Sequence, residues 1–110
     1  MANTFTRKTS QNVGASPGQI GGYTVPASTT TIVIGLVCTN TTGSAITANV
    51  FLANATANTY IVANAPISSG ASLIPIGGDQ KIVMITGDKI YVQSSAATSI
   101  DAILSIMEIT

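Results

Sequence analysis

The residues that could perform chemistry are few and dispersed. The chain of 110 residues contains no histidine, one cysteine and four carboxylates. This composition removes the usual general bases, the serine–histidine and cysteine–histidine nucleophile pairs and imidazole metal ligands. By parity, Asp101 and Glu108 fall on opposite faces of one strand, so they make a poor acid/base pair. We expect no catalytic residue, no cofactor and no metal ion, and therefore no enzyme.

Two acidic turns and two glycine pairs have simpler explanations than ion binding. Asp79 and Asp88 follow glycines in the related segments GDQKIV and GDKIYV. Calcium takes about six to eight oxygen ligands, and each aspartate stands alone in its turn. The repeat therefore indicates a hairpin that uses the same turn residues twice. The glycine pairs at 21–22 and 77–78 lack the following helix and lysine of a phosphate loop.

The single cysteine, Cys38, cannot form an internal disulfide. It occupies a regular strand position after the run IVIGLV, where a small buried hydrophobe is favoured over a reactive thiol. The segments at 40–42 and 54–56 match the N-glycosylation pattern, which a chain rich in threonine and asparagine reaches by chance. The N-terminus lacks the charged start and apolar segment of a signal peptide.

The composition indicates a surface with little charge. Hydrophobic residues make up 45% of the chain and charged residues 7%, with a net charge of zero; an ordinary soluble domain has about 25% charged residues. Near-zero net charge promotes association, so we expect the flanks to face other protein subunits. The alternative is a neutral, well-hydrated surface rich in threonine. The absence of a basic patch argues against nucleic-acid binding, and no apolar run is long enough for a membrane helix.

Short β-branched segments separated by turn residues predict an all-β fold. Their spacing of roughly 8 to 12 residues is typical of an antiparallel sandwich or small barrel. We predict an antiparallel β-sandwich, jelly-roll-like, of about eight strands. The predicted strands span residues 19–25, 29–40, 45–53, 59–64, 71–76, 81–86, 89–94 and 99–109.

Two long strands are expected near the sheet centres. The segment 29–40 is apolar on both faces, which is typical of a strand covered on both sides. Its second cover could come from another sheet edge or from another chain. The segment 99–109 has some helical spacing, but its β-branched content and lack of helix-end signals favour a strand.

The chain divides into an extended N-terminal arm, residues 1–18, and a β-sandwich domain, residues 19–110. The arm is polar and shows neither helical nor strand periodicity. Such a segment is ordered only where something holds it. Either a neighbouring subunit or the surface of its own domain would serve. If the arm reaches a partner, we expect Phe5, Arg7, Lys8 and Val13 to make the contact.

Several motifs resemble those of small β-sandwich virion structural proteins of tailed bacteriophages, over residues 22–109. They are Tyr23-Thr24-Val25-Pro26, the strand at 32–36, the turn Asn40-Thr41-Thr42-Gly43-Ser44, Ala65-Pro66-Ile67 and the alternating strand at 103–109. The resemblance implies assembly in place of catalysis, and it carries over no catalytic residue.

The resemblance leads to three hypotheses for a non-enzymatic protein. The first is a capsid decoration or cement protein on the virion surface, which binds and stabilises the shell of major capsid protein as a homo-oligomer, for which we expect a trimer. The second is a tail, neck or baseplate component. The third is a host-surface carbohydrate-binding module, in which Tyr60 and Tyr91 would lie on an exposed face; alternatively, both tyrosines pack between strands. None of the three needs nucleic acid or a membrane.

Overall fold

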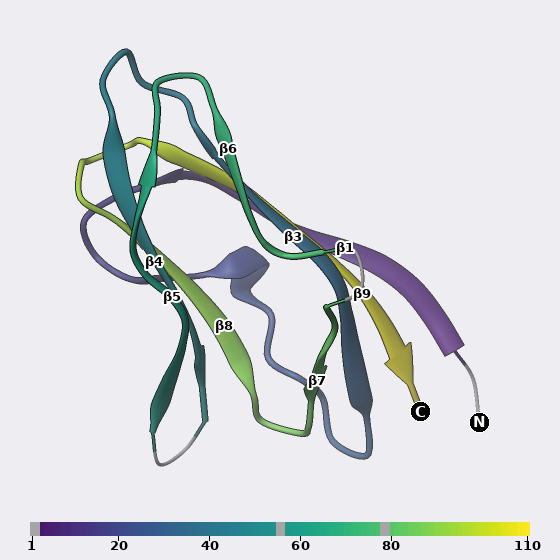
Figure 1. The fold of residues 1–110 in the computed structure, drawn as a ribbon. Helices are drawn as coiled ribbons and strands as arrows, with labels where there is room; N and C mark the ends of the chain where they lie inside the picture. The colour runs from purple at the N-terminus through teal and green to yellow at the C-terminus, as the bar shows by residue number, and fades with distance from the viewer. Residues whose placement is uncertain (1–2, 55–56, 78–79) are drawn as a thin grey trace.

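The chain forms two antiparallel β-sheets that face each other (Figure 1). The computed structural model describes residues 3–54, 57–77 and 80–110, and over these residues there are nine strands. Sheet A has the order β1 (Asn3–Val13), β9 (Ile100–Ile109), β3 (Thr30–Asn40), β6 (Ser72–Ile76), and β7 (Ile82–Met84) also pairs with β3. Sheet B has the order β2 (Gly18–Gln19), β8 (Lys89–Ser94), β4 (Ile46–Ala53), β5 (Asn58–Ile67).

The predicted sandwich is confirmed, and the two long strands lie where the sequence indicates. The hairpin predicted from the repeat of GDQKIV and GDKIYV is wrong, because β7 pairs with β3 in sheet A whereas β8 pairs with β4 and β2 in sheet B. β3 and β9 are neighbours in the interior of sheet A, paired from Thr30↔Ile109 to Asn40↔Ile100. β5 continues through Pro66 to Ile67, which is compatible with its position at the edge of sheet B because an edge strand can spare one donor.

The predicted strand at 19–25 is wrong over most of its length. Only Gln19 belongs to β2, and Ile20–Gly22 form the 3₁₀ turn η1. Gly21 and Gly22 have φ angles of 60° and 65°, a left-handed conformation that glycine adopts without steric cost. The turn closes with a hydrogen bond from the Tyr23 N–H to the Ile20 carbonyl, 3.1 Å.

The N-terminal segment packs along its own domain, which is one of the two arrangements that the sequence left open. β1 pairs with β9 from Asn3↔Ile109 to Val13↔Ile100, with a bulge between Ser10 and Val13. Exposed and half-buried residues alternate along it up to Ser10. Its inward side chains are threonine, lysine and serine, so the alternation leaves no hydrophobic period in the sequence.

The core fills the space between the two sheets. η1 lies in this space (Figure 1) and places Ile20 there with no exposed surface. Other large side chains without appreciable exposure come from strands of both sheets, among them Val33, Leu36, Val50, Ile76, Met84, Ile90, Val92, Ile100, Leu104 and Ile106. Each such burial stabilises the fold by about 1.5–3 kcal/mol, and the inner faces of both sheets contribute to one core.

A buried asparagine joins the two sheets at one end. The Asn40 side chain has no exposed surface, and its Nδ2 donates to the carbonyl oxygens of Ser44 (2.8 Å) and Ile67 (3.0 Å). Its Oδ1 accepts from the N–H (2.9 Å) and the hydroxyl (2.7 Å) of Thr42. Four bonds use both donors and both lone pairs of the amide. The turn after β3 and the end of β5 are therefore held by one side chain.

Candidate functional site

The carboxylates at the two ends of β9 have structural partners. Glu108 Oε2 accepts a hydrogen bond from the Tyr23 hydroxyl, 2.8 Å, and that hydroxyl also lies 2.7 Å from Thr31 Oγ1. Burial, and the carboxylate of Glu108, raise the pKa of Tyr23 to about 12. Asp101 lies on the opposite face of the strand and accepts the Asn12 N–H at 3.1 Å. The two carboxylates are separate, as parity predicts.

The other residues with chemical potential also have structural roles. Asp88 is buried and its Oδ2 accepts the Ile85 N–H, 3.0 Å, which closes the turn before β8; Asp79 lies outside the described residues. Among residues 3–54, 57–77 and 80–110 no cluster of three metal-ligating side chains occurs. The same residues include no helix with the length and hydrophobicity to span a membrane.

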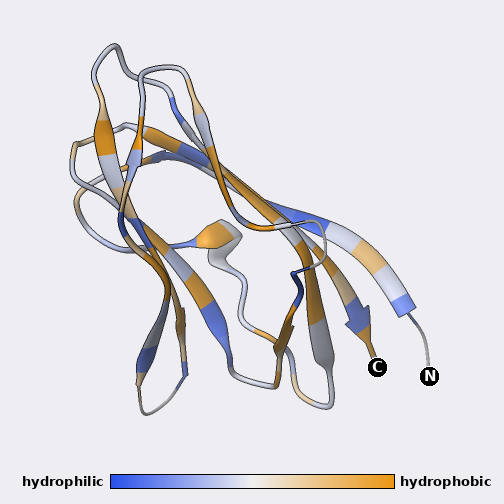
Figure 2. Ribbon diagram, viewed as in Figure 1, coloured by the Kyte–Doolittle hydropathy of each residue, from blue (hydrophilic) through white to orange (hydrophobic). Residues whose placement is uncertain are grey.

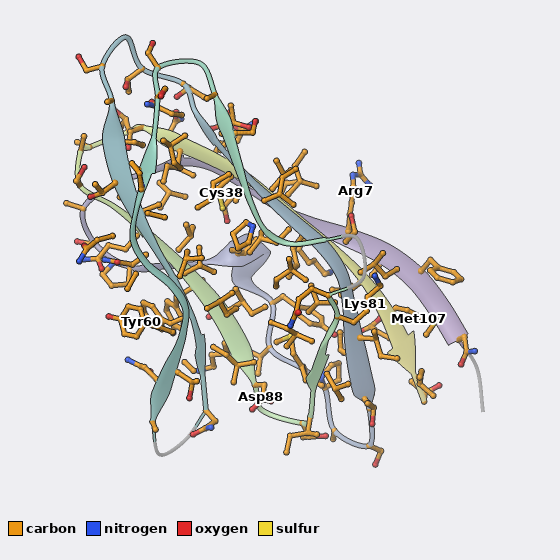
Figure 3. The ribbon with its side chains drawn as sticks, viewed as in Figure 1. Arg7, Cys38, Tyr60, Lys81, Asp88 and Met107 are labelled. Carbon is orange, nitrogen blue, oxygen red and sulfur yellow. The ribbon has the colours of Figure 1, made fainter. Side chains whose placement is uncertain are left out.

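Cys38 lies between the sheets (Figure 3) and has no exposed surface. Burial raises the pKa of its thiol to about 12. The thiolate is the nucleophilic form of cysteine, so the folded chain keeps Cys38 as an unreactive part of the core, as the sequence predicts.

The outer face of sheet A carries an apolar row across its whole width. The registers align Phe5 on β1, Met107 on β9, Ile32 on β3 and Val83 on β7 in one row. Phe5 is 72% exposed and Val83 is 61% exposed. Ile103 points to the same side of β9 as Met107 and is 45% exposed. It pairs with Val37 on β3.

We refer to these outward side chains of sheet A as the apolar face. Figure 2 shows the hydrophobic colour running along β3 and β9 beneath it. Its members are Phe5, Ile32, Ile34, Val37, Val83, Ile103 and Met107, with Ile74 exposed on the edge strand β6. A polar row of Arg7, Ser105 and Gly35 lies between the row of Phe5 and the pair of Ile103 and Val37. Large apolar side chains that gather exposed on one face of a protein mark interaction sites.

The structure separates the four partner-binding residues that the sequence suggests. Phe5 and Arg7 point outward from β1, and Arg7 projects away from the sandwich (Figure 3). Lys8 points inward, with its Nζ 5.3 Å from the centre of the Tyr23 ring, and Val13 is 8% exposed in the core. Phe5 therefore lies on the apolar face, Arg7 lies beside it on the same side of the sheet, and Lys8 and Val13 have partners inside the chain.

Most residues of the apolar face cannot be identified from the sequence alone. Ile32, Val83 and Met107 are far apart in the sequence and meet only through the pairing of three strands. The signal that points to them is the two-sided hydrophobicity of the segment 29–40. The sequence assigns that second face to another sheet edge or another chain, and in the structure it lies outward on sheet A.

The outer face of sheet B has a different character. Tyr91 on β8, Phe51 on β4 and Tyr60 on β5 form a row across three strands. The rings of Phe51 and Tyr91 are stacked, with centroids 5.3 Å apart and an interplanar angle of 5°. The rings of Phe51 and Tyr60 are 5.1 Å apart and tilted by 40°. This aromatic row borders a pocket of about 450 Å³.

Comparison with known proteins finds similarity of fold. No family model matches the sequence, and no curated protein matches it either. Among solved structures, a subunit of Bacillus endospore appendages, described as a novel family of disulfide-linked pili, superposes with a TM-score of 0.54 and 15% identity. The match covers 100% of this chain and 91% of the pilus protein.

Two viral proteins show weaker similarity. The extra small virus particle of the giant freshwater prawn Macrobrachium rosenbergii gives a TM-score of 0.47 at 10% identity, over 98% of this chain and 79% of the viral one. Infectious bursal disease virus, Gt strain, gives 0.46 at 11% identity, over 97% of this chain and 32% of that one. Of the three, the pilus protein has a TM-score above 0.5, and at 15% identity the likeness shows a shared fold.

Proposed function

We propose that the chain is a non-enzymatic structural subunit of a virion. Within the virion it is a decoration or cement protein on the capsid surface, which binds the major capsid protein and stabilises the shell. The observation that carries the proposal is the apolar face of sheet A. Its side chains lie outside the core, and their exposure to water is unfavourable unless another protein surface covers them.

The occupant of the apolar face is a second copy of this chain. Four strands side by side at about 4.8 Å, and ten residues at about 3.4 Å, give a projected area of about 650 Å². This area approaches the roughly 800 Å² that each partner contributes to a standard interface. Arg7 and Asp101 lie on this side of the sheet, separated along the strands by about 13 Å. Since their charges are opposite, a neighbouring copy can pair them.

The free edge of β1 is the proposed contact with the capsid protein. Among the described residues, β1 has β9 as its one strand partner, and η1 packs against it near Lys8 and Ser10. The first part of β1, around Phe5 and Arg7, therefore has no strand on its other side. An open edge accepts a strand from another protein, and Phe5 and Arg7 lie beside it. Many copies of such a contact on one shell add avidity to a modest single affinity.

Three observations support an assembly function. The sequence motifs resemble those of tailed-phage virion proteins, the composition has little charge, and a protein of the same fold forms pili. Those pili are disulfide-linked, whereas Cys38 has no exposed surface here. Assembly of this chain would therefore depend on noncovalent contacts.

The experiment is quantitative mass spectrometry of purified virus particles. The account expects a ratio of this protein to major capsid protein near one, or near a simple fraction of one. A handful of copies per particle would move the protein to the tail, the neck or the baseplate, which is the alternative within the same class. Absence from the particles would overturn the virion assignment.

A further inference from the structure

The pocket on the outer face of sheet B has the features of a ligand site. Its volume of about 450 Å³ falls within the usual range of about 300–1,000 Å³ for small-molecule sites. Phe51 and Tyr91 form one wall, and Pro17 contributes another apolar surface. Such sites combine aromatic walls with a few placed polar groups.

The polar groups around the pocket come from two neighbouring segments. Asn54 follows β4, Asn58 begins β5 and Lys89 begins β8. Asn58 is exposed, Lys89 is half-buried, and Lys89 has no ion pair with any of the described residues. Among the described residues that line the pocket, Lys89 is also the one that carries a charge. The pocket therefore offers a cation and amides beside aromatic rings.

We propose that this pocket binds an acidic saccharide, a pyranose that carries a carboxylate. A pyranose ring has an apolar C–H side that packs on aromatic surface, and hydroxyl groups around its rim that bond to amides. Phe51 is 5% exposed beneath the stacked ring of Tyr91, so the half-buried Tyr91 ring receives the apolar side of the sugar. Asn58 bonds to hydroxyls, and Lys89 pairs with the carboxylate.

The exposed ring of Tyr60 extends the site beyond one sugar. Tyr60 is 54% exposed and packs against Phe51, outside the pocket lining. The rings of Tyr91, Phe51 and Tyr60 follow one row across the sheet. A chain of sugars would place one unit in the pocket and a following unit against Tyr60, so the site favours an oligosaccharide over a monosaccharide.

This assignment is independent of the apolar face, because the two features lie on opposite sides of the sandwich. Sheet A and sheet B turn their inner faces toward the common core. A sugar ligand on sheet B leaves the association of sheet A unobstructed. Failure of sugar binding would leave the proposed structural function in place, and loss of association would leave the sugar site in place.

The test is an NMR titration of the full chain with tetragalacturonic acid and with its methyl ester. The ester has the same rings without the carboxylate charge. We expect the acid to bind at least about tenfold more tightly, with shifts in the residues of the pocket. Lys89→Met should remove the preference for the acid, and Lys89→Arg should restore most of it. Tyr60→Ala should weaken binding of both ligands about fivefold.

Arg7→Met on sheet A is the matched control, since it removes an equal charge from the opposite face. It should leave the affinity for the acid unchanged. Equal loss in Arg7→Met and Lys89→Met would mean general charge attraction and would overturn the site. Equal affinity for acid and ester would overturn the acidic saccharide as the ligand, and so would the absence of binding.

Discussion

On sheet A the outward row of Phe5, Met107, Ile32 and Val83 is apolar from one edge to the other. On sheet B the corresponding row is aromatic, and amides and a lysine surround it. The inner faces of both sheets contribute aliphatic side chains to one core. The two sheets are therefore alike on their inner faces, which form the core, and differ on their outer faces.

The difference indicates two kinds of partner. A broad apolar face gains free energy by excluding water over a large area, which suits a protein surface of matching shape. A small pocket with aromatic walls and a few polar groups suits a small polar ligand. One sandwich of 110 residues can in this way carry an assembly face and a recognition face without one obstructing the other.

Asn40 holds the turn after β3 to the end of β5 and so helps to join the two sheets. We expect Asn40→Asp to have the largest effect on stability among the variants proposed. A carboxylate cannot donate to the carbonyls of Ser44 and Ile67, and it places a charge in a fully buried position. We expect the free energy of unfolding to fall by about 3–5 kcal/mol, measured by urea denaturation. The same exchange at the exposed Asn58 should change it by less than about 0.5 kcal/mol. Similar values for both would contradict the role of Asn40.

A pair of glycines tests whether β1 belongs to sheet A and so to the apolar face. A Cβ on Gly21 would stand 2.6 Å from Lys8 Cβ, whereas a Cβ on Gly22 would meet nothing within 4 Å. Both residues have positive φ, so each alanine costs about 1–2 kcal/mol of backbone strain. Gly21→Ala should cost about 1–2 kcal/mol more through the overlap. Equal losses of unfolding free energy would mean that β1 does not pack against η1.

Alkaline pH tests the shared core of the two sheets. The pKa of Tyr23 rises from 10.0 to about 12 and that of Cys38 from 9.0 to about 12, both mainly through burial. The unfolded chain ionises at lower pH than the folded one, so the contribution of these two groups to stability is fully present below about pH 9 and is lost between about pH 9 and 12. Melting curves followed by circular dichroism should show this fall. The double variant Tyr23→Phe/Cys38→Ala should flatten it, and an unchanged slope would contradict the assignment.

The smallest expected effect concerns the apolar face itself. Ile103 is 45% exposed, so Ile103→Thr removes little buried surface from the isolated chain. The free energy of unfolding should change by less than about 0.5 kcal/mol at protein concentrations too low for association. A loss above about 2 kcal/mol would mean that Ile103 belongs to the core and not to an interface.

Strands whose side chains follow a clear pattern can be predicted from the sequence. The β-branched run of β3 and the polar turn at residues 40–44 predict the conformation of this segment, and the two apolar faces of β3 predict its central place. β1 escapes prediction because its inward residues, such as Thr6 and Ser10, are polar and leave no hydrophobic period. The reversal at Gly21 depends on the close approach of Lys8, a contact that local sequence cannot show.

The sequence predicts that outward faces of the sandwich bind partners, but it does not predict which residues make up each face. The two-sided hydrophobicity of β3 indicates that something covers sheet A. The row that joins Phe5 to Val83 depends on the registers of four strands, and strand order is not visible in one sequence. The sequence suggests Tyr60 and Tyr91 as an exposed pair, whereas Phe51, which lies between them, gives no signal because it sits in an ordinary strand segment.

Sedimentation velocity of the purified chain tests whether the apolar face binds other copies. We predict that the wild-type chain sediments as an oligomer at concentrations on the order of 10–100 μM. Val83→Lys/Ile103→Lys places two charges on the face and should weaken association by about 100-fold, since each desolvated charge costs at least about 1.4 kcal/mol. Tyr60→Lys/Gln93→Lys on sheet B is the control and should sediment like the wild type. A monomeric wild-type chain, or an oligomer that both double variants preserve, would contradict the account.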